Sequence, residues 1–450
     1  MSKRELLLLL RLLLFLSAYY GFFLNKQLKI PDSLSSPRNA AMTSTVAVIM
    51  VGGPSTSNFR ALGSVPAPLF PIAGRSLIDH PIRAAAALPG LKAVYVVGFY
   101  EERDFSLYLS GLSAAVSMPI RYLQESRGHG SAGGLHEFRA TLMEEKPEAV
   151  FVLYCDVCCS FPLGGAVRCR AAARAVSRAP PRPDLLAAQL SHPGALGTML
   201  VKRVPAAKAS ECGEVVEEAA THALLHYTER PETLVSDLVD TGVYVFSPSL
   251  FDVIASVLAA KPPSTEAGFV RMADVLTPFA GKQTLFVHET KDFWDFVKAP
   301  GHTLKASELY LEHFRATQPA LLAPSRPEGP AVVGNCYVHA SAKVAPTAKL
   351  GPNVTVSTSC RVGDGARLIN CILLDGAEVG DHAFVANAII GWKSRLGTWS
   401  RVQGSGAGEA KNGVCILGED VSVAAEVVVV NCIVLPHKEI RASVKDEVIL

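Results

Sequence analysis

"VHASAKVAPTAKLGPNVTVSTSCRVGDGARL" (residues 338–368) decides the fold of the C-terminal part of this chain, because an aliphatic residue recurs in it at every sixth position. Such repeats are typical of a left-handed parallel β-helix, in which each short strand turns its aliphatic residue inward. Alternating antiparallel strands would give a period of two instead. The series departs from this spacing at 374–379, 385–396 and 402–417, and comprises Val338, Val344, Leu350, Val356, Val362, Leu368, Leu374, Val379, Val385, Leu396, Val402, Leu417, Val423, Val429 and Leu435. We therefore expect a left-handed β-helix over residues 333–450, with an inserted loop at 403–415.

Upstream of the repeats, residues 46–318 follow a different pattern, in which short apolar runs alternate with helical segments. Continuous apolar strands separated by helices indicate a parallel sheet covered on both faces. The expected fold class is α/β, with a Rossmann-like domain, a proline-rich linker at 319–332 and then the β-helix. The expected strands are 46–51, 92–98, 120–125, 150–156, 224–229, 243–248 and 283–289, and the expected helices are 76–88, 133–145 and 303–318.

Composition narrows the class of protein. A chain of 450 residues is too long for one ordinary core, so two domains are expected. The formal net charge of +2 gives no argument for nucleic-acid binding, which usually requires a basic face. Ten cysteines are scattered without the spacing of a disulfide framework, which favours free thiols in a reducing compartment such as the cytoplasm. The C-x-x-C within residues 155–159 is interpreted as a pair of buried structural thiols.

The N-terminal segment, residues 1–45, departs from this picture. It begins with basic residues followed by an apolar run, Leu6–Leu24, which is nearly long enough to cross a bilayer but is interrupted by Arg11. The segment could be a membrane anchor or a targeting signal. It could equally be a dispensable extension, with Met42 as the functional start.

Several stretches outside this segment resemble one enzyme family. The chain from Val46 to Leu450 resembles the sugar-nucleotide pyrophosphorylases, and within them the alpha subunits of GDP-mannose pyrophosphorylase (mannose-1-phosphate guanylyltransferase). The stretches that carry the resemblance are "VGGP" (51–54), "PLFPIAGRSLIDHPI" (68–82), "RYLQE" (121–125), "GSAGGLHEFR" (130–139), "HYTERPETLVSDLVDTGVYVFSP" (226–248) and "NCIVLPHKEI" (431–440). The resemblance implies a nucleotidyltransferase-like first domain.

The resemblance also implies a chemistry, in which a sugar 1-phosphate attacks the α-phosphate of a nucleoside triphosphate and pyrophosphate leaves. Active members carry a glycine-rich motif with an arginine, which ends in Pro-Lys-Pro. Gly52 and Gly53 match the motif glycines, whose backbone amides approach a phosphate or a base. Arg60 is the arginine that remains. Ala67 occupies the lysine position, so one cation that neutralises phosphate charge is absent.

In active members two aspartates on separate strands hold Mg²⁺. Asp156 matches the first of them. Phe296 stands at the position of the second, and Asp295 comes one residue earlier. One step along a strand reverses the face, so Asp295 is expected to point away from the metal position. The resemblance therefore implies a weak Mg²⁺ site built on Asp156, and no organic cofactor.

Residues matching the family's ligand contacts are mostly present. Arg230 replaces a lysine and Asp240 replaces an asparagine of the family pattern. The implied base-side residues are Gln124 and Gly130, and the implied sugar-side residues are Gly213, Glu229, Arg230 and Asp240.

Together these residues favour a regulatory, catalytically impaired subunit. Such a subunit would bind GDP-mannose, assemble into an oligomer with a catalytic beta subunit, and control GDP-mannose synthesis for glycosylation. One alternative is an active pyrophosphorylase in which Arg60 supplies the missing charge. A third hypothesis is an acyltransferase, because hexapeptide β-helices often host that chemistry; His339 is the only histidine near the start of a coil.

Overall fold

The computed structural model describes residues 44–53, 58–63, 65–164, 184–261, 269–406 and 413–450. The predictions for residues 1–43, which include the apolar run Leu6–Leu24 and Met42, lie outside these ranges. Within the described ranges, no helix combines the length and the apolarity that a bilayer crossing requires.

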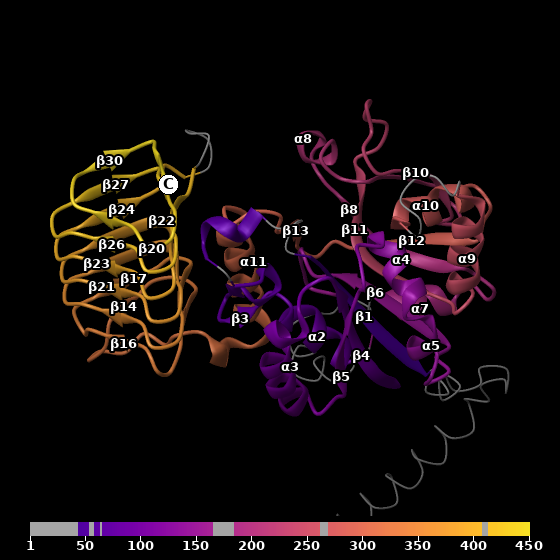
Figure 1. Cartoon of the computed structure of the whole chain (residues 1–450), viewed down its shortest axis with the longest axis horizontal. Coiled ribbons are helices and arrows are strands. Elements are labelled where there is room, and N and C mark those ends of the chain that lie inside the picture. The colour runs from indigo at the N-terminus through magenta and orange to yellow at the C-terminus, as the bar shows by residue number, and fades with distance from the viewer. Residues whose placement is uncertain (1–43, 54–57, 64, 165–183, 262–268, 407–412) are drawn as a thin grey trace, which may run out of the picture. The chain divides into compact units, whose positions relative to one another are not determined.

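A nine-stranded mixed sheet forms the centre of the first domain (Figure 1). Its main path is β10-β9-β11-β6-β1-β4-β5, and β8 pairs with both β11 and β12. Parallel pairing joins β1 to β4 and β6, and β4 to β5. The strands are β1 (Thr45–Gly52), β4 (Leu91–Gly98), β5 (Ile120–Gln124), β6 (Ala149–Tyr154), β8 (Gly197–Arg203), β9 (Glu214–Glu217), β10 (Leu224–Thr228), β11 (Leu238–Phe246) and β12 (Leu285–Glu289).

The expectation of a wholly parallel sheet is wrong at β11, which runs antiparallel to both β6 and β8. A strand buried on both faces is apolar throughout, whichever way it runs, so its composition does not reveal its direction. The reversal matters for function. It brings the N-terminal end of β11 to the edge of the sheet where the parallel strands β6, β1, β4 and β5 end.

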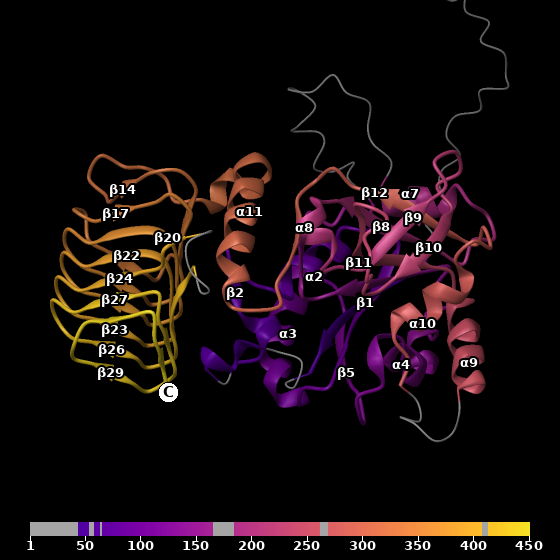
Figure 2. The ribbon, with the colours of Figure 1, turned by 90° about the horizontal axis from the view of Figure 1, so that it is seen from above.

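Helices cover both faces of this sheet (Figure 1, Figure 2). Successive residues of β1 point to opposite faces, so Ala47 and Ile49 belong to one hydrophobic cluster while Val46 and Val48 belong to the other. The first cluster includes residues of α2 (Asp79–Ala86), α3 (Glu102–Val116), α7 (Leu185–Leu190) and α11 (His302–Thr317), and the second includes residues of α4 (Gly130–Glu137), α5 (Arg139–Leu142), α9 (Leu250–Ala260) and α10 (Met272–Leu276).

Short elements complete the domain. Two small antiparallel pairs lie outside the main sheet, namely β2 with β3 and β7 with β13. The short elements are η2 (Asn58–Ala61), η3 (Ala67–Leu69), β2 (Pro71–Ile72), β3 (Arg75–Ser76), β7 (Val157–Cys159), α8 (Ala206–Ala209), η4 (Thr277–Phe279), β13 (Trp294–Phe296) and η5 (Pro319–Leu321).

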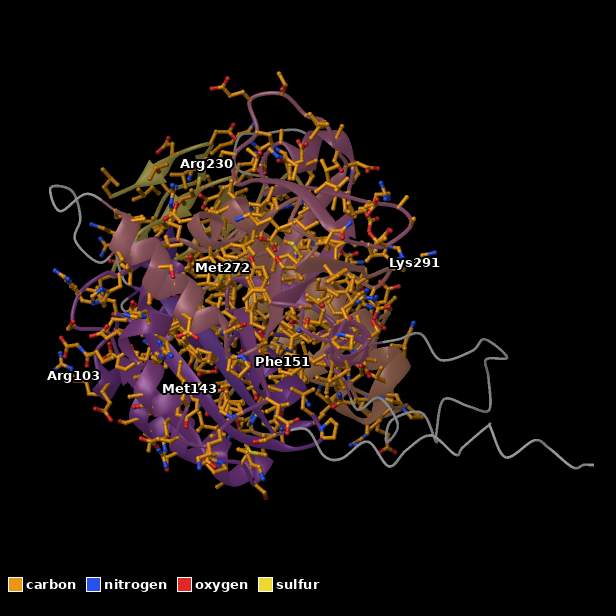
Figure 3. The ribbon with its side chains drawn as sticks, turned by 90° about the vertical axis from the view of Figure 1, so that its right-hand side faces the viewer. Arg103, Met143, Phe151, Arg230, Met272 and Lys291 are labelled. Carbon is orange, nitrogen blue, oxygen red and sulfur yellow. The ribbon has the colours of Figure 1, made fainter. Side chains whose placement is uncertain are left out.

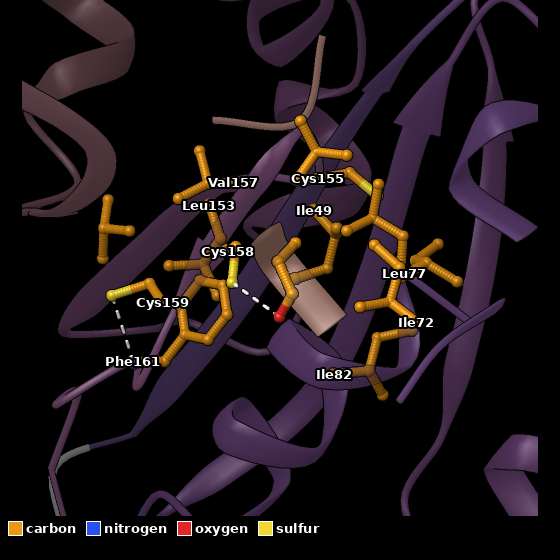
Figure 4. Close-up of a cluster of buried hydrophobic side chains, with 14 of the residues drawn as sticks. Ile49, Ile72, Leu77, Ile82, Leu153, Cys155, Val157, Cys158, Cys159 and Phe161 are labelled. Carbon is orange, nitrogen blue, oxygen red and sulfur yellow. Dashed lines mark hydrogen bonds between the residues drawn. The ribbon is translucent and has the colours of Figure 1, made fainter. Parts of the chain in front are cut away.

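The cysteines of β7 and the turn before it belong to the hydrophobic core. Cys155, Cys158 and Cys159 pack among Ile49 and other aliphatic side chains (Figure 4). Burial raises the pKa of the Cys159 thiol to about 12, and it raises the pKa values of the other two thiols as well. All cysteines in the described ranges are free and buried. These thiols stay protonated and pack as small apolar groups.

The C-terminal part is a parallel β-helix (Figure 2). Each strand pairs in parallel with the equivalent strand of the next coil, for example β16 with β19 and β19 with β21. The strands are β14 (Ala331–Val332), β15 (Cys336–Val338), β16 (Lys343–Val344), β17 (Lys349–Leu350), β18 (Val354–Val356), β19 (Arg361–Val362), β20 (Arg367–Leu373), β21 (Glu378–Val379), β22 (Phe384–Ile390), β23 (Arg395–Leu396), β24 (Arg401–Gln403), β25 (Cys415–Leu417), β26 (Ser422–Val423), β27 (Val428–Val430), β28 (Ile433–Val434), β29 (Glu439–Ile440), β30 (Val444–Lys445) and β31 (Val448–Ile449).

Two of the predicted inward residues are wrong by one position. Val356 pairs with Leu373, and Leu373 rather than Leu374 lies in the interior cluster of the β-helix. The reason is that this coil is one residue shorter than the preceding one, in which Val338 pairs with Val356. Leu374 instead lies in the cluster that contains residues of α11. Likewise Leu417 pairs with Val434, so Val434 replaces the predicted Leu435 in the interior.

Close stacking of the coils leads to a stability prediction. A Cβ added at Gly391 would lie 2.0 Å from the carbonyl oxygen of Gly418, a backbone atom that cannot move without distorting the next coil. We expect Gly391→Ala to lower stability by roughly 1–3 kcal/mol, the usual cost of overpacking. The measurement is the midpoint of chemical unfolding. In the control Gly111→Ala the added Cβ meets nothing within 4 Å on α3, so a gain of about 0.5–1 kcal/mol is expected. Equal stability of Gly391→Ala and the parent would contradict the packing.

Candidate functional site

The candidate site lies along the edge of the sheet where the parallel strands end. Gly52 closes β1 and Gly53 follows it, Gln124 closes β5, and Asp156 follows β6. Asp240 joins them from the N-terminal end of the antiparallel β11. This edge is where ligands of open α/β sheets bind.

The turn after β1 is closely packed and leaves little room for side chains. Gly52 has a φ of +66°, in the region that favours glycine. A Cβ at Gly53 would lie 3.1 Å from the Cβ of Phe99, and one at Gly98 would lie 2.4 Å from Val51. The N–H of Phe99 donates to the carbonyl oxygen of Gly52 over 2.8 Å. The turn therefore leaves its backbone open to close approach by a ligand.

Two positions where the family resemblance implies a cation that neutralises phosphate charge, Arg60 and Ala67, follow this turn. The backbone of Arg60 lies in η2, while its side chain lies outside what the structure describes. Ala67 begins η3 and packs against the hydrophobic cluster below it. The methyl group thus contributes to the core and brings no charge to the edge of the sheet.

On the base side, the predicted residues have partners within the protein. The side-chain carbonyl oxygen of Gln124 accepts the N–H of Glu102 over 3.3 Å, next to the first turn of α3. Gly130 has a φ of +78°, and a Cβ there would lie 2.6 Å from the carbonyl oxygen of Val270. The N–H of Ala132 donates to that same oxygen over 2.9 Å. The glycine-rich loop is therefore fastened to the segment that precedes α10.

Glu125 is a buried acid that sequence reasoning missed. Its Oε1 has no hydrogen-bond partner within the described residues, and a Cβ at Gly134 would lie 2.5 Å from it. Burial raises the pKa of Glu125 to about 7; the backbone N–H of His129 opposes this shift, and the negative charge of Glu137 adds to it. The only sequence signal was its place directly after Gln124 in the "RYLQE" stretch.

On the sugar side, Asp240 is held by a hydroxyl network. Its Oδ2 accepts the hydroxyl groups of Tyr227, over 3.2 Å, and of Tyr244, and its Oδ1 accepts the N–H of Gly242 over 2.9 Å. Burial raises the pKa of Asp240 despite these donors. A Cβ at Gly213 would lie 3.0 Å from the Tyr227 hydroxyl oxygen. The structure thus brings Gly213 and Asp240 together around two tyrosines that sequence reasoning did not single out.

Glu229 and Arg230 lie beyond this network, at the end of β10. Oε2 of Glu229 is 3.0 Å from Nη1 of Arg271, and both side chains are about half exposed. Arg230 is exposed at the surface of the domain (Figure 3). Arg271 is a further residue that sequence reasoning missed, because it immediately precedes α10, outside every motif.

The metal position is defined by how β13 lies against β7. Phe296 pairs with Val157, and the N–H of Val297 donates to the carbonyl oxygen of Asp156 over 2.7 Å. Asp295 is directed to a lysine, with its Oδ1 2.7 Å from Nζ of Lys208. Asp156 is exposed to solvent, but the surrounding protein partly desolvates its carboxyl and raises the pKa of that group. The positive charge of Lys298 opposes this rise.

These residues offer a magnesium ion one carboxylate, Asp156, where the resemblance implies two. Mg²⁺ takes an octahedral set of oxygen ligands and is usually held by one or two carboxylates together with substrate phosphates. Here Phe296, which by resemblance stands at the position of the second carboxylate, offers no ligand oxygen, and it pairs with Val157. Over the described ranges, no three side chains of His, Cys, Asp or Glu gather in a way that could hold a metal ion.

The histidine considered for acyl transfer lies in the β-helix. His339 is exposed, and its Nδ1 is 2.8 Å from Oγ of Ser341 in the same turn. No further acidic or nucleophilic partner of this ring is recorded within the described residues.

Comparison with known proteins gives two family matches and a set of full-length relatives. Residues 46–180 match the nucleotidyl transferase family, and residues 332–450 match the GMPPB C-terminal domain. The mannose-1-phosphate guanylyltransferase regulatory subunit alpha of Dictyostelium discoideum is 36% identical over 433 residues, which cover 91% of this chain and 99% of that protein. The human protein of the same name is 36% identical over 437 residues, and the alpha-A protein of Danio rerio is 34% identical over 438 residues; each alignment covers 90% of this chain and 99% of the relative.

The buried acid yields a pH prediction. Glu125 has an ordinary pKa of 4.5 when unfolded and about 7 when folded. Between these values the folded chain binds more protons than the unfolded chain, so stability falls as the pH rises. Glu125→Gln removes this loss. Its stability relative to the parent should therefore rise by up to about 3 kcal/mol between pH 4.5 and pH 8.

Urea unfolding at both pH values measures this difference. Glu145→Gln, at an exposed glutamate, serves as the control and should show no such trend. A Glu125→Gln variant whose relative stability is the same at both pH values would contradict the raised pKa.

Proposed function

We propose that this chain binds GDP-mannose and controls its synthesis without making it at a useful rate. The chain belongs to the family of regulatory alpha subunits of mannose-1-phosphate guanylyltransferase. The observation that carries the proposal is the contrast within one site. The backbone turn of Gly52 and Gly53 is kept, while Ala67 and Phe296 stand where transfer chemistry needs a cation and a carboxylate.

Magnitudes support recognition without turnover. Removing one preorganised group that stabilises developing charge typically costs about 10²–10³ in rate. Two such losses in one site need not multiply, but together they would remove most of the acceleration. Binding is less demanding, because a ligand is held by many weaker contacts. Glycine backbone at the carboxyl edge, Gln124 near the base and Glu229 near the sugar would supply such contacts.

The relatives are named regulatory subunits, and a regulatory subunit requires a catalytic one. We therefore infer that this chain assembles with the catalytic beta subunit of GDP-mannose pyrophosphorylase into an oligomer, with the β-helix supplying assembly surface. We also infer a cytoplasmic location, because free buried thiols throughout the described ranges suit a reducing compartment.

Turnover is the first test. Purified full-length chain supplied with GTP, mannose 1-phosphate and Mg²⁺ is expected to release pyrophosphate at least about 10³-fold more slowly than a catalytic beta subunit, because two charged groups are missing. Titration calorimetry with GDP-mannose should nevertheless give a saturable signal. Turnover by this chain alone at a rate near that of the beta subunit would overturn the regulatory assignment and favour the alternative, an active pyrophosphorylase.

A matched pair of variants tests the sugar side. Glu229→Ala should weaken GDP-mannose binding about 10-fold or more, the usual consequence of losing a hydrogen bond to a charged group. Glu232→Ala removes the same side chain from an exposed position three residues further along the chain and should leave the affinity unchanged. Equal effects of the two variants in calorimetry would show that Glu229 has no specific contact with the ligand.

A further inference from the structure

Lys298 is a cation whose charge acts on the carboxyl of Asp156, opposing the rise in the pKa of that group. The hydrogen bond from the Val297 N–H to the carbonyl oxygen of Asp156 fixes the backbone one residue before Lys298. The N–H of Lys298 itself donates to Nδ1 of His302, over 3.3 Å, in the first turn of α11. The lysine backbone is therefore held from both sides, by the β7–β13 pair and by a helix.

The side chain of Lys298 lies over the ring that replaces the second metal ligand. Its Nζ is 4.8 Å from the ring centroid of Phe296, and the side chain is exposed to solvent. Lys208 lies near the same ring, with its Nζ 5.4 Å from the centroid, but its charge is neutralised by Asp295 at 2.7 Å. Lys298 forms no ion pair with any residue in the described ranges, so its charge remains available to a ligand.

We propose that the ammonium group of Lys298 takes the place of the magnesium ion as counter-charge to the diphosphate, so that this site binds a nucleoside diphosphate sugar without a divalent cation. The inference rests on the proposed function, since it concerns the same ligand in the same site.

The charge balance of the site supports this exchange. In the family's active members, as the resemblance implies, two carboxylates offset the two charges of one magnesium ion. Here one carboxylate, Asp156, offsets one lysine, so the diphosphate meets the same net charge. Without Lys298 it would meet an uncompensated carboxylate, and like charges at short range repel strongly. A lysine is an effective phosphate partner because its flexible stem carries a compact charge with three donors.

The same exchange would separate binding from transfer. A magnesium ion can coordinate oxygens of the attacking and leaving groups and stabilise the charge that develops between them. An ammonium group attracts phosphate oxygens but offers no coordination sites. A pocket with Lys298 in place of the ion is therefore suited to hold the finished product and poorly suited to form it.

The test is calorimetry with GDP-mannose on the full-length chain, in buffer with millimolar MgCl₂ and again with excess EDTA. Because Lys298 supplies the counter-charge, the dissociation constants in the two buffers should agree within about twofold. Binding with MgCl₂ that weakens tenfold or more in EDTA would overturn this inference alone. Absence of binding in both buffers would overturn the proposed function, and this inference with it.

Variants identify the group responsible. Lys298→Ala should weaken binding in EDTA about tenfold or more, whereas Lys298→Arg, which keeps the charge, should stay within about threefold of the parent. Lys291→Ala removes the same charge from an exposed position seven residues earlier (Figure 3) and should bind as the parent does. Lys298 is exposed, so its replacement should leave the fold intact, and circular dichroism checks this. Parent-like affinity of Lys298→Ala in EDTA would overturn the assignment.

Discussion

The pairing of β13 with β7 is the constraint on which the site depends. The hydrogen bond from Val297 to Asp156 fixes the register, which pairs Phe296 with Val157. Asp295, one residue earlier, bonds to Lys208, whose Nζ also lies 5.4 Å from the centroid of the Phe296 ring. Which residue stands at the implied second ligand position thus depends on backbone pairing as well as on composition.

The register is held by the hydrophobic core. The N–H of Cys159 donates to the hydroxyl oxygen of Tyr310 over 3.2 Å, and that ring stacks on His80 at a centroid distance of 3.7 Å. Burial lowers the pKa of His80 to about 3, so the stacked imidazole is neutral at physiological pH. Tyr310 belongs to α11, which also contacts β20 and β22 of the β-helix. The hydroxyl oxygens of Ser307 in α11 and Thr355 in the β-helix are 3.0 Å apart. Displacing β13 would therefore disturb packing that reaches the β-helix.

The sequence predicted the parts of the fold that depend on local periodicity. Aliphatic residues at every sixth position indicate a β-helix, because each coil must fill the same interior. The slip at Leu373 could not be placed, since Leu374 is equally apolar and is also buried, on the other side of the strand. The direction of β11 was unpredictable for a similar reason, because an apolar strand reads alike both ways. Helix α3 was missed altogether.

The candidate site shows the same division. Gly52 and Gly130 were singled out through the resemblance, and the structure gives both a positive φ, which favours glycine. Tyr227, Tyr244 and Arg271 were not singled out. The order of strands in the sheet brings the two tyrosines to Asp240, and the segment before α10 brings Arg271 to Glu229. The role proposed for Lys298 likewise follows from strand pairing, which residue type alone does not reveal.

Electron paramagnetic resonance of Mn²⁺, a paramagnetic substitute for Mg²⁺, would show whether this site holds a divalent cation. The full-length chain is mixed with GDP-mannose and titrated with Mn²⁺. We expect the spectrum of Mn²⁺ with GDP-mannose alone, with no additional protein-bound ion. One tightly bound ion per chain that disappears in Asp156→Ala would contradict this expectation.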